Sequence, residues 1–142
     1  KERVVFVDLG QELISNPSSI LNKIIGLVEM HMPDRLVIDP ITPITDMLHW
    51  RGETREFMHE LFAKLKAYDC ITLITAEMNY DDISKKMEAY MVDGVLMLSY
   101  PEEDKVRRKF LEVLKMRGTR HVTGRQLVEI GPEGFAVQPG LR

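Results

Sequence analysis

Cysteine is almost absent from this sequence, with Cys70 alone among 142 residues. One cysteine excludes an internal disulfide and gives no support to a zinc site, which needs several cysteine or histidine ligands. Long apolar runs are also missing, and none approaches the roughly 20 residues of a membrane-spanning helix. We therefore expect a soluble protein of a reducing compartment, the cytoplasm, with no membrane partner.

A glycine-rich phosphate loop is the second absence. No Gly-x-x-x-x-Gly-Lys-Ser/Thr segment occurs, and none of the nine glycines opens a predicted helix beside a lysine. Such a loop cradles the β- and γ-phosphates of a nucleotide with its backbone N–H groups. These residues by themselves therefore lack the usual means of holding a nucleoside triphosphate.

The composition is otherwise that of one globular domain, with 44% hydrophobic and 29% charged residues and a net charge of −3. Positive charge gathers in residues 105–125, where eight Lys or Arg residues accompany one acid, Glu112. We expect this basic stretch to meet an anion. The candidates are nucleic acid, a nucleotide phosphate and an acidic patch on a neighbouring subunit.

The aliphatic run 36–38, between Pro33 and Pro40, predicts a buried central strand of a parallel sheet. It ends in Asp39, so a carboxylate stands at the carboxyl end of the strand, where open α/β sheets bind their ligands. Asp39 either holds a metal ion or a metal-bound water, or it caps the following turn. The strand alone leaves both interpretations open.

Strand and helix patterns alternate along the chain. Short apolar runs predict buried strands, and apolar residues at helical spacing predict amphipathic helices. This alternation indicates an α/β fold, a mostly parallel sheet flanked by helices in a three-layer sandwich with an antiparallel C-terminal hairpin. The predicted strands are residues 4–7, 36–39, 71–75 and 95–98, the helices are residues 16–32, 53–67 and a short one from residue 81, and the hairpin is residues 127–137.

Two segments are less clear. Residues 40–52 read as a loop. Trp50 in this loop is either a contact for a partner or a packed anchor, and we expect the anchor. Residues 106–116 carry a helical stripe of apolar side chains, and their propensities also favour a helix. Taken alone, this second segment would be assigned as a helix.

Four segments stand in a characteristic order: the strand that ends in Asp39, Thr75-Ala76-Glu77, Val92-Asp93-Gly94-Val95, and Lys115-Met116-Arg117-Gly118-Thr119-Arg120-His121. Together they resemble the KaiC branch of the RecA-like ATPases. The resemblance runs over essentially the whole chain, and the Lys-Met-Arg-Gly segment followed by His is its most specific part. It implies a RecA-like sheet in which residues 109–115 form a strand, against their helical propensity.

The resemblance also implies an ATPase whose cofactors are ATP and Mg²⁺. Asp39 would be the Walker B acid that holds the Mg²⁺ of Mg-ATP. Glu77 would lie near the γ-phosphate and the attacking water, although a purely structural role fits it as well.

Lys115 and Arg117 would project onto the γ-phosphate bound by the next subunit, as arginine fingers do. Met116, Thr119 and His121 would line the base and sugar of the nucleotide from the same side. Taken singly, these residues also fit plainer roles. The two cations could be solvated charges beside a tight turn, Met116 core packing, and the other two surface residues.

In that family the phosphate loop, its strand and the acid that activates water all precede the equivalent of residue 1. The resemblance therefore implies that residues 1–142 are the C-terminal portion of a single ATPase domain. We expect a parent protein that hydrolyses ATP as a homo-oligomeric, hexameric ring, and an inactive fragment that depends on the missing segment or a neighbouring subunit for ATP. Since the missing strand is central in that fold, unpaired strand edges are also expected.

Two other functions stay open. One is a nucleic-acid-binding module like the recombinase branch of the same superfamily, whose two central loops would correspond to residues 41–52 and 78–91. The second of these loops holds three acids and no glycine, which suits a nucleic-acid groove poorly, so this alternative is not favoured. The other is an inactive scaffold of the same fold.

Overall fold

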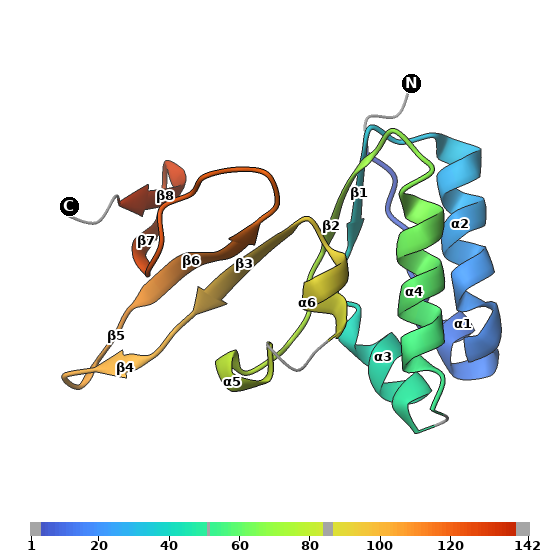
Figure 1. Ribbon diagram of the computed structural model, residues 1–142, viewed down its shortest axis with the longest axis horizontal. Helices are drawn as coiled ribbons and strands as arrows, with labels where there is room; N and C mark the ends of the chain where they lie inside the picture. The colour runs from blue at the N-terminus through green and yellow to red at the C-terminus, as the bar shows by residue number, and fades with distance from the viewer. Residues whose placement is uncertain (1–3, 51, 84–86, 139–142) are drawn as a thin grey trace. The chain divides into compact units, whose positions relative to one another are not determined.

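Helices and strands alternate as an α/β protein, which confirms the predicted fold class. The computed structural model describes residues 4–50, 52–83 and 87–138, and the chain divides into two compact units, residues 1–88 and residues 89–142 (Figure 1). The elements are α1 (Gly10–Ser15), the 3-10 helix η1 (Pro17–Ser19), α2 (Ile20–His31), β1 (Arg35–Ile38), α3 (Thr42–His49), α4 (Thr54–Leu65), β2 (Ile71–Ile74), α5 (Tyr80–Ile83), α6 (Met87–Met91), β3 (Gly94–Ser99), β4 (Glu102–Glu103), β5 (Val106–Arg107), β6 (Lys109–Met116), β7 (Gln126–Gly131) and β8 (Gly134–Gln138).

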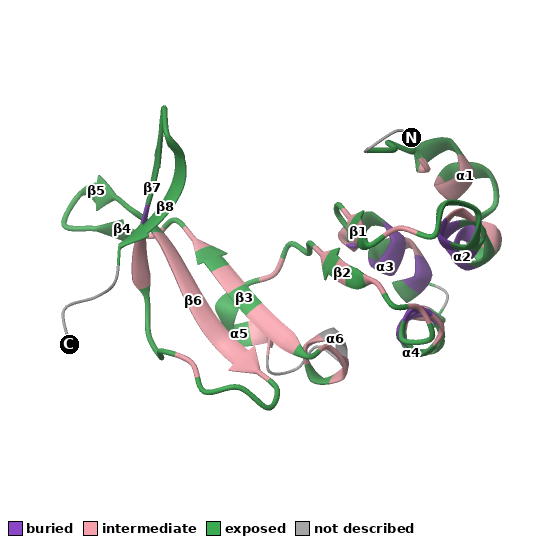
Figure 2. Ribbon diagram, turned by 90° about the horizontal axis from the view of Figure 1, so that it is seen from above, coloured by how far each residue is buried: buried purple, intermediate pink, exposed green. Residues whose placement is uncertain are grey.

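The first unit is built on two parallel strands with helices along one side. β1 and β2 pair with Val37 opposite Leu73. α2 and α4 run beside this pair (Figure 1), and the buried residues of the unit concentrate in α2, α3 and α4 (Figure 2). On the other side of the pair, Val37 is 59% and Leu73 55% exposed. The helices therefore cover one face of the two strands.

Apolar side chains at helical spacing form the core of this unit. Ile20 on α2 and Leu61 on α4 are fully buried, and Met58 is 1% exposed. Burial of such a side chain contributes roughly 1.5–3 kcal/mol. The predicted helices at residues 16–32 and 53–67 are confirmed within a few residues, and contact between their apolar faces holds the unit together.

Four local predictions are wrong. The strand β1 is not a buried central strand, since Val37 is 59% exposed and in the described residues β1 pairs with β2 alone. Residues 4–7 form no strand, and Phe6 is 93% exposed, because no neighbouring strand pairs with this run in the part of the chain that the structure describes. The predicted loop 40–52 contains the helix α3, whose second residue is Pro43, a position that proline tolerates. Trp50 is 90% exposed, so it is not a packed anchor.

The second unit is an antiparallel sheet in the strand order β3-β6-β7-β8. β6 is a strand, as the resemblance implied and local propensity did not, because it pairs with β3 on one side and β7 on the other. β7 and β8 form the predicted hairpin. Among the described residues, β1 and β2 are the parallel part of the fold and this sheet is its antiparallel end. Within the part of the chain that the structure describes, β1, β2 and β3 each pair with a strand on one side only.

A hydrogen bond ties the turn after α4 to α2. The hydroxyl of Tyr68 donates to Glu29 Oε1 over 2.9 Å. This bond to a carboxylate raises the pKa of Tyr68 above its ordinary value of 10.0, because it stabilises the protonated phenol. The folded state therefore holds the phenolic proton more tightly than the unfolded state.

The Tyr68 bond predicts a loss of stability in alkali. Because the folded pKa is the higher one, the contribution is complete below about pH 10 and is lost as the pH rises through the folded pKa. We expect the free energy of unfolding of the first unit, measured by urea denaturation, to fall more steeply above about pH 10 in the wild type than in Tyr68→Phe. Equal slopes in the two proteins would refute the assignment.

Candidate nucleotide site

The carboxyl ends of β1 and β2 bring four polar residues together, which we call the strand-end cluster: Asp39, Thr42, Thr75 and Glu77. Asp39 directly follows β1, and the Thr75 hydroxyl donates a hydrogen bond to Asp39 Oδ1. The backbone N–H of Glu77 donates to Thr42 Oγ1 over 2.8 Å. The backbone keeps the two strand ends together, with Ile41 N–H donating to the Thr75 carbonyl over 2.9 Å.

The strand-end cluster offers hard oxygen ligands to solvent. Asp39, Thr75 and Glu77 are all exposed. Carboxylate and hydroxyl oxygens suit Mg²⁺, which is commonly held by one or two carboxylates together with the phosphates of its substrate. In residues 4–50, 52–83 and 87–138, no three His, Cys, Asp or Glu side chains lie close enough to hold a metal by themselves. The cluster therefore fits Mg²⁺ that arrives with a phosphate ligand.

Lys115, near the end of β6, is held by the end of α6. Its Nζ donates to the carbonyl oxygens of Ala89, Tyr90 and Val92 over 3.1, 3.0 and 2.7 Å. Carbonyls in the last turn of a helix have no partner within the helix, so a cation there satisfies them. We call residues 89–93 the α6 turn.

Arg117 contacts the same α6 turn. Its Nη1 lies 3.1 Å from Asp93 Oδ1, and its Nη2 donates to the Tyr90 carbonyl over 3.3 Å. The backbone N–H of Arg117 also donates to the Asp93 carbonyl over 2.7 Å. The two side chains stay accessible, since Arg117 is 52% and Asp93 73% exposed. The predicted cations thus share one anchoring segment.

Met116, Thr119 and His121 follow the strand into a tight turn. A side chain at Gly94 would meet Met116 Sδ at 3.1 Å, so glycine lets Met116 pack against the start of β3. Gly118 has φ +68°, and the N–H of Thr119 donates to the Met116 carbonyl over 3.3 Å. His121 Nδ1 lies 3.3 Å from the Thr119 carbonyl oxygen.

The predicted site residues therefore fall into two groups, one in each unit. Thr42 and Asp93 were not among the predicted site residues. Thr42 starts a helix that was read as a loop, and Asp93 was quoted only as part of a motif. A signal for Asp93 existed, since an acid at the start of one strand can meet a base at the end of its antiparallel neighbour.

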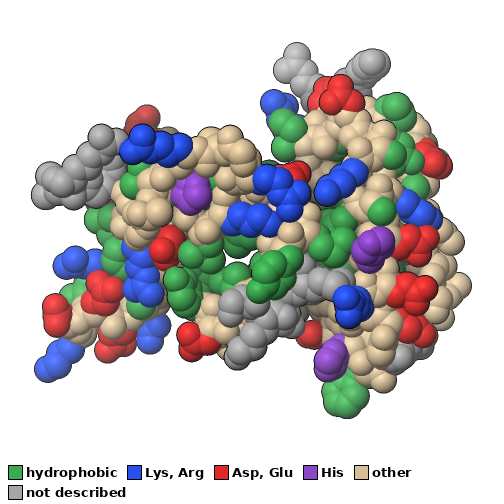
Figure 3. Space-filling model, viewed as in Figure 1, with side chains coloured by type: hydrophobic (Ala, Val, Ile, Leu, Met, Phe, Trp, Pro, Cys, Tyr) green, Lys and Arg blue, Asp and Glu red, His purple; other side chains and the backbone are tan. Residues whose placement is uncertain are grey.

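The basic stretch is largely engaged within its own unit. Arg107 and Arg125 form ion pairs with Glu102 and Glu103, and Lys109 lies over the ring of Tyr100. With Lys115 and Arg117, at least five of the eight bases have contacts to described residues of their own unit. Acidic and basic side chains also alternate around the β4–β5 hairpin at the lower left of Figure 3. This pattern gives little support to a continuous groove for nucleic acid.

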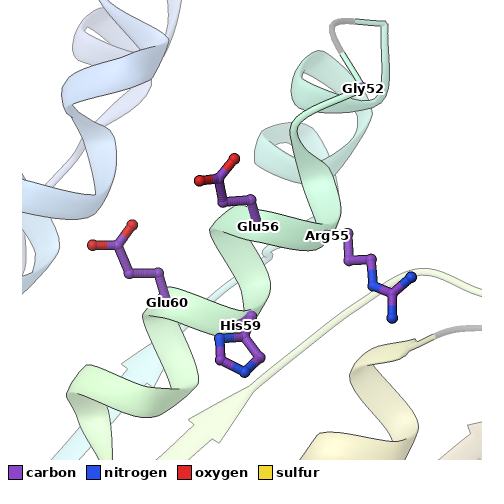
Figure 4. A pocket seen from close by; sticks show the side chains of 5 residues that line it. All are labelled: Gly52, Arg55, Glu56, His59 and Glu60. Carbon is purple, nitrogen blue, oxygen red and sulfur yellow. The ribbon is translucent and has the colours of Figure 1, made fainter.

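A shallow hollow lies elsewhere, on the outer face of α4. It is lined by Gly52, Arg55, Glu56, His59 and Glu60. Figure 4 shows that the Glu56 and Glu60 carboxylates point to one side of the helix and the Arg55 guanidinium to the other. Side chains that diverge in this way do not converge on a ligand, and none of the predicted site residues lines this hollow.

Comparison with known proteins decides the family. The sequence model of the family described as "ATPase: KaiC" matches residues 4–142. The chain belongs to the KaiC ATPase family. The predicted resemblance is therefore confirmed over the length on which it was based.

Relatives within the KaiC family give the extent of the match. The circadian clock oscillator protein KaiC of Synechococcus elongatus is 28% identical over 135 residues, which cover 92% of this chain and 26% of that protein. The KaiC of Prochlorococcus marinus subsp. pastoris is 30% identical over 133 residues, covering 90% of this chain and 26% of that protein. The chain spans about a quarter of the length of these curated relatives.

A solved structure agrees with the KaiC-type fold. The crystal structure of a KaiC-like protein from the hyperthermophilic archaeon Pyrococcus horikoshii matches with a TM-score of 0.73 and 29% sequence identity. The match covers 88% of this chain and 58% of that one. This supports the RecA-like, KaiC-type architecture. No helix in the described part of the chain is long and apolar enough to cross a bilayer.

Proposed function

We propose that this chain is the C-terminal portion of a KaiC-type ATPase domain whose active sites form between subunits of a homo-oligomeric ring. It contributes Asp39 to one ATP site and Lys115 and Arg117 to the site of the next subunit. The observation that carries the proposal is the strand-end cluster, an exposed set of hard oxygen ligands at the carboxyl ends of parallel strands in a chain that the KaiC family matches from residue 4 onward.

Asp39 would hold Mg²⁺, with the Thr75 hydroxyl fixing the orientation of its carboxylate. The bound Mg²⁺ supplies charge neutralisation at the phosphates of ATP. Glu77 stands at the neighbouring strand end and is exposed. We assign it to the surroundings of the γ-phosphate and the attacking water, where a carboxylate accepts a hydrogen bond from that water and orients it.

Lys115 and Arg117 would act on a phosphate held by the neighbouring subunit. The planar guanidinium of Arg117 matches phosphate oxygens with two parallel N–H bonds, while Lys115 adds a compact charge. Both would offset the charge that develops on the transferred phosphoryl group. Met116, Thr119 and His121 are on the same segment and would line the base and sugar of that nucleotide.

A catalytically inactive scaffold is the second candidate. The observation that favours it is the engagement of Lys115, whose three N–H donors all bind carbonyl oxygens of its own subunit. A protein of this kind would keep the fold and the assembly while binding no nucleotide. A direct test of shared active sites separates the two candidates.

Subunit mixing provides that test in the full-length protein that contains this chain. Asp39→Asn and Arg117→Ala should each abolish ATP hydrolysis when expressed alone. Co-expressed at equal levels, they should restore about one interface in four, because an interface built from unlike faces needs Asp39 from one subunit and Arg117 from the other. Steady-state hydrolysis of Mg-ATP by the purified oligomers measures this recovery.

The matched control mixes Asp39→Asn with the double variant Asp39→Asn/Arg117→Ala, where no interface regains Asp39. Recovery in the first mixture alone supports the proposal. No recovery would mean that both residues act within one subunit. A wild-type protein that neither binds nor hydrolyses ATP would support the scaffold.

A further inference from the structure

The α6 turn occupies every hydrogen-bond donor of Lys115. An ammonium group has three N–H donors, and all three carbonyl contacts lie within 3.1 Å. Lys115 cannot therefore bind a phosphate oxygen without giving up at least one of these bonds. Each bond that it gives up removes a charged donor from a carbonyl at the end of α6.

Arg117 is restrained by a carboxylate in the same turn. The 3.1 Å contact between Nη1 and Asp93 Oδ1 neutralises the charge that a phosphate would attract. An anion approaching Arg117 in this position also meets the negative charge of Asp93, which opposes its binding. The α6 turn and an incoming phosphate therefore compete for the same two cations.

We propose that the α6 turn is an autoinhibitory resting site, which holds Lys115 and Arg117 until the γ-phosphate of a nucleotide on the neighbouring subunit draws them away. This inference rests on the proposed function and adds its regulation. Release of the two side chains removes five hydrogen bonds from residues 89–93, three from Lys115 and two from Arg117. The turn then reports the state of a nucleotide bound to another subunit.

The ion pair between Arg117 and Asp93 is weak enough for a phosphate to displace it. Arg117 and Asp93 are both more than half exposed. An exposed ion pair changes an equilibrium constant by about two- to five-fold. The interaction of Arg117 with a γ-phosphate can be stronger than that. Removing the charge of Asp93 should therefore raise the affinity of the full-length protein for Mg-ATP about two- to five-fold, with the affinity for Mg-ADP unchanged.

Asp93→Asn tests this in the full-length protein by titration calorimetry with Mg-ATP and with Mg-ADP. Asp104→Asn is the matched control, an exposed acid in the turn between β4 and β5 of the same unit. A gain for ATP alone, in Asp93→Asn alone, supports the resting site. Lower ATP affinity in Asp93→Asn would overturn it, because Asp93 would then help Arg117 to bind the phosphate.

Hydrogen exchange followed by mass spectrometry gives the second readout. In the wild type, peptides covering residues 87–94 should exchange faster with Mg-ATP than with Mg-ADP. Without nucleotide, Lys115→Met should already exchange faster there, whereas Lys109→Met on the same strand should not. If Lys115→Met leaves this exchange unchanged, the resting site is refuted. If Lys115→Met raises the exchange of residues 87–94 but Mg-ATP does not, Lys115 has only a structural role and the switch is refuted. If the wild type binds no nucleotide at all, the proposed function itself is refuted.

Discussion

Arg117→Ala is expected to lower kcat for ATP hydrolysis by about 10³-fold or more in the full-length protein, which is the scale of an arginine finger. Affinity for ATP should change only a few-fold, because the strand-end cluster and the remaining nucleotide contacts stay in place. Arg117→Lys should fail to restore the rate, since an ammonium group cannot present two parallel N–H donors to a phosphate. Single-turnover hydrolysis and equilibrium binding separate the two effects.

Arg120→Ala is the control for this result. Arg120 is an exposed cation three residues further along, outside the α6 turn. We expect its loss to leave kcat within about two-fold, as for a solvated surface charge. A similar rate for Arg117→Ala and Arg120→Ala would show that Arg117 does not act on the phosphate, and its ion pair with Asp93 would then be its main role.

Leu61→Ala should destabilise the first unit by about 3 kcal/mol, because it removes a fully buried side chain and leaves a cavity at the centre of α4. Urea denaturation followed by far-ultraviolet circular dichroism measures the change. His59→Ala, on the exposed side of the same helix, should stay within about 0.5 kcal/mol of the wild type. A loss below about 1 kcal/mol for Leu61→Ala would contradict the packing of α4 against α2.

Much of the fold was predictable where one periodicity dominated. The stripe of apolar residues on α4 has no competing interpretation, and the helix lies within two residues of its predicted ends. α3 was missed because Thr42 and Pro43 read as turn residues, although Ile41, Ile44 and Leu48 carry a helical spacing. β6 shows the reverse, since its local propensity favours a helix and its two strand partners decide otherwise.

The candidate site was predictable in its residue types but less so in its contacts. A carboxylate after an aliphatic strand indicated Asp39, and a family motif indicated Lys115 and Arg117. Their binding to the α6 turn had no sequence signature, because the three acceptors of Lys115 are backbone carbonyls, which every residue carries. The prediction of a strand at residues 4–7 was wrong for a related reason, since a strand forms only where the backbone of another strand pairs with it.

The separation of the β1-β2 pair from the β3-β6-β7-β8 sheet also bears on cooperativity. In the described residues neither of these sheets takes a strand from the other, and they belong to different compact units. The chain by itself should then melt in two transitions, and a single melting temperature would not describe it. Leu61→Ala should shift the transition of the first unit, whereas substitutions at Asp93 should shift that of the second.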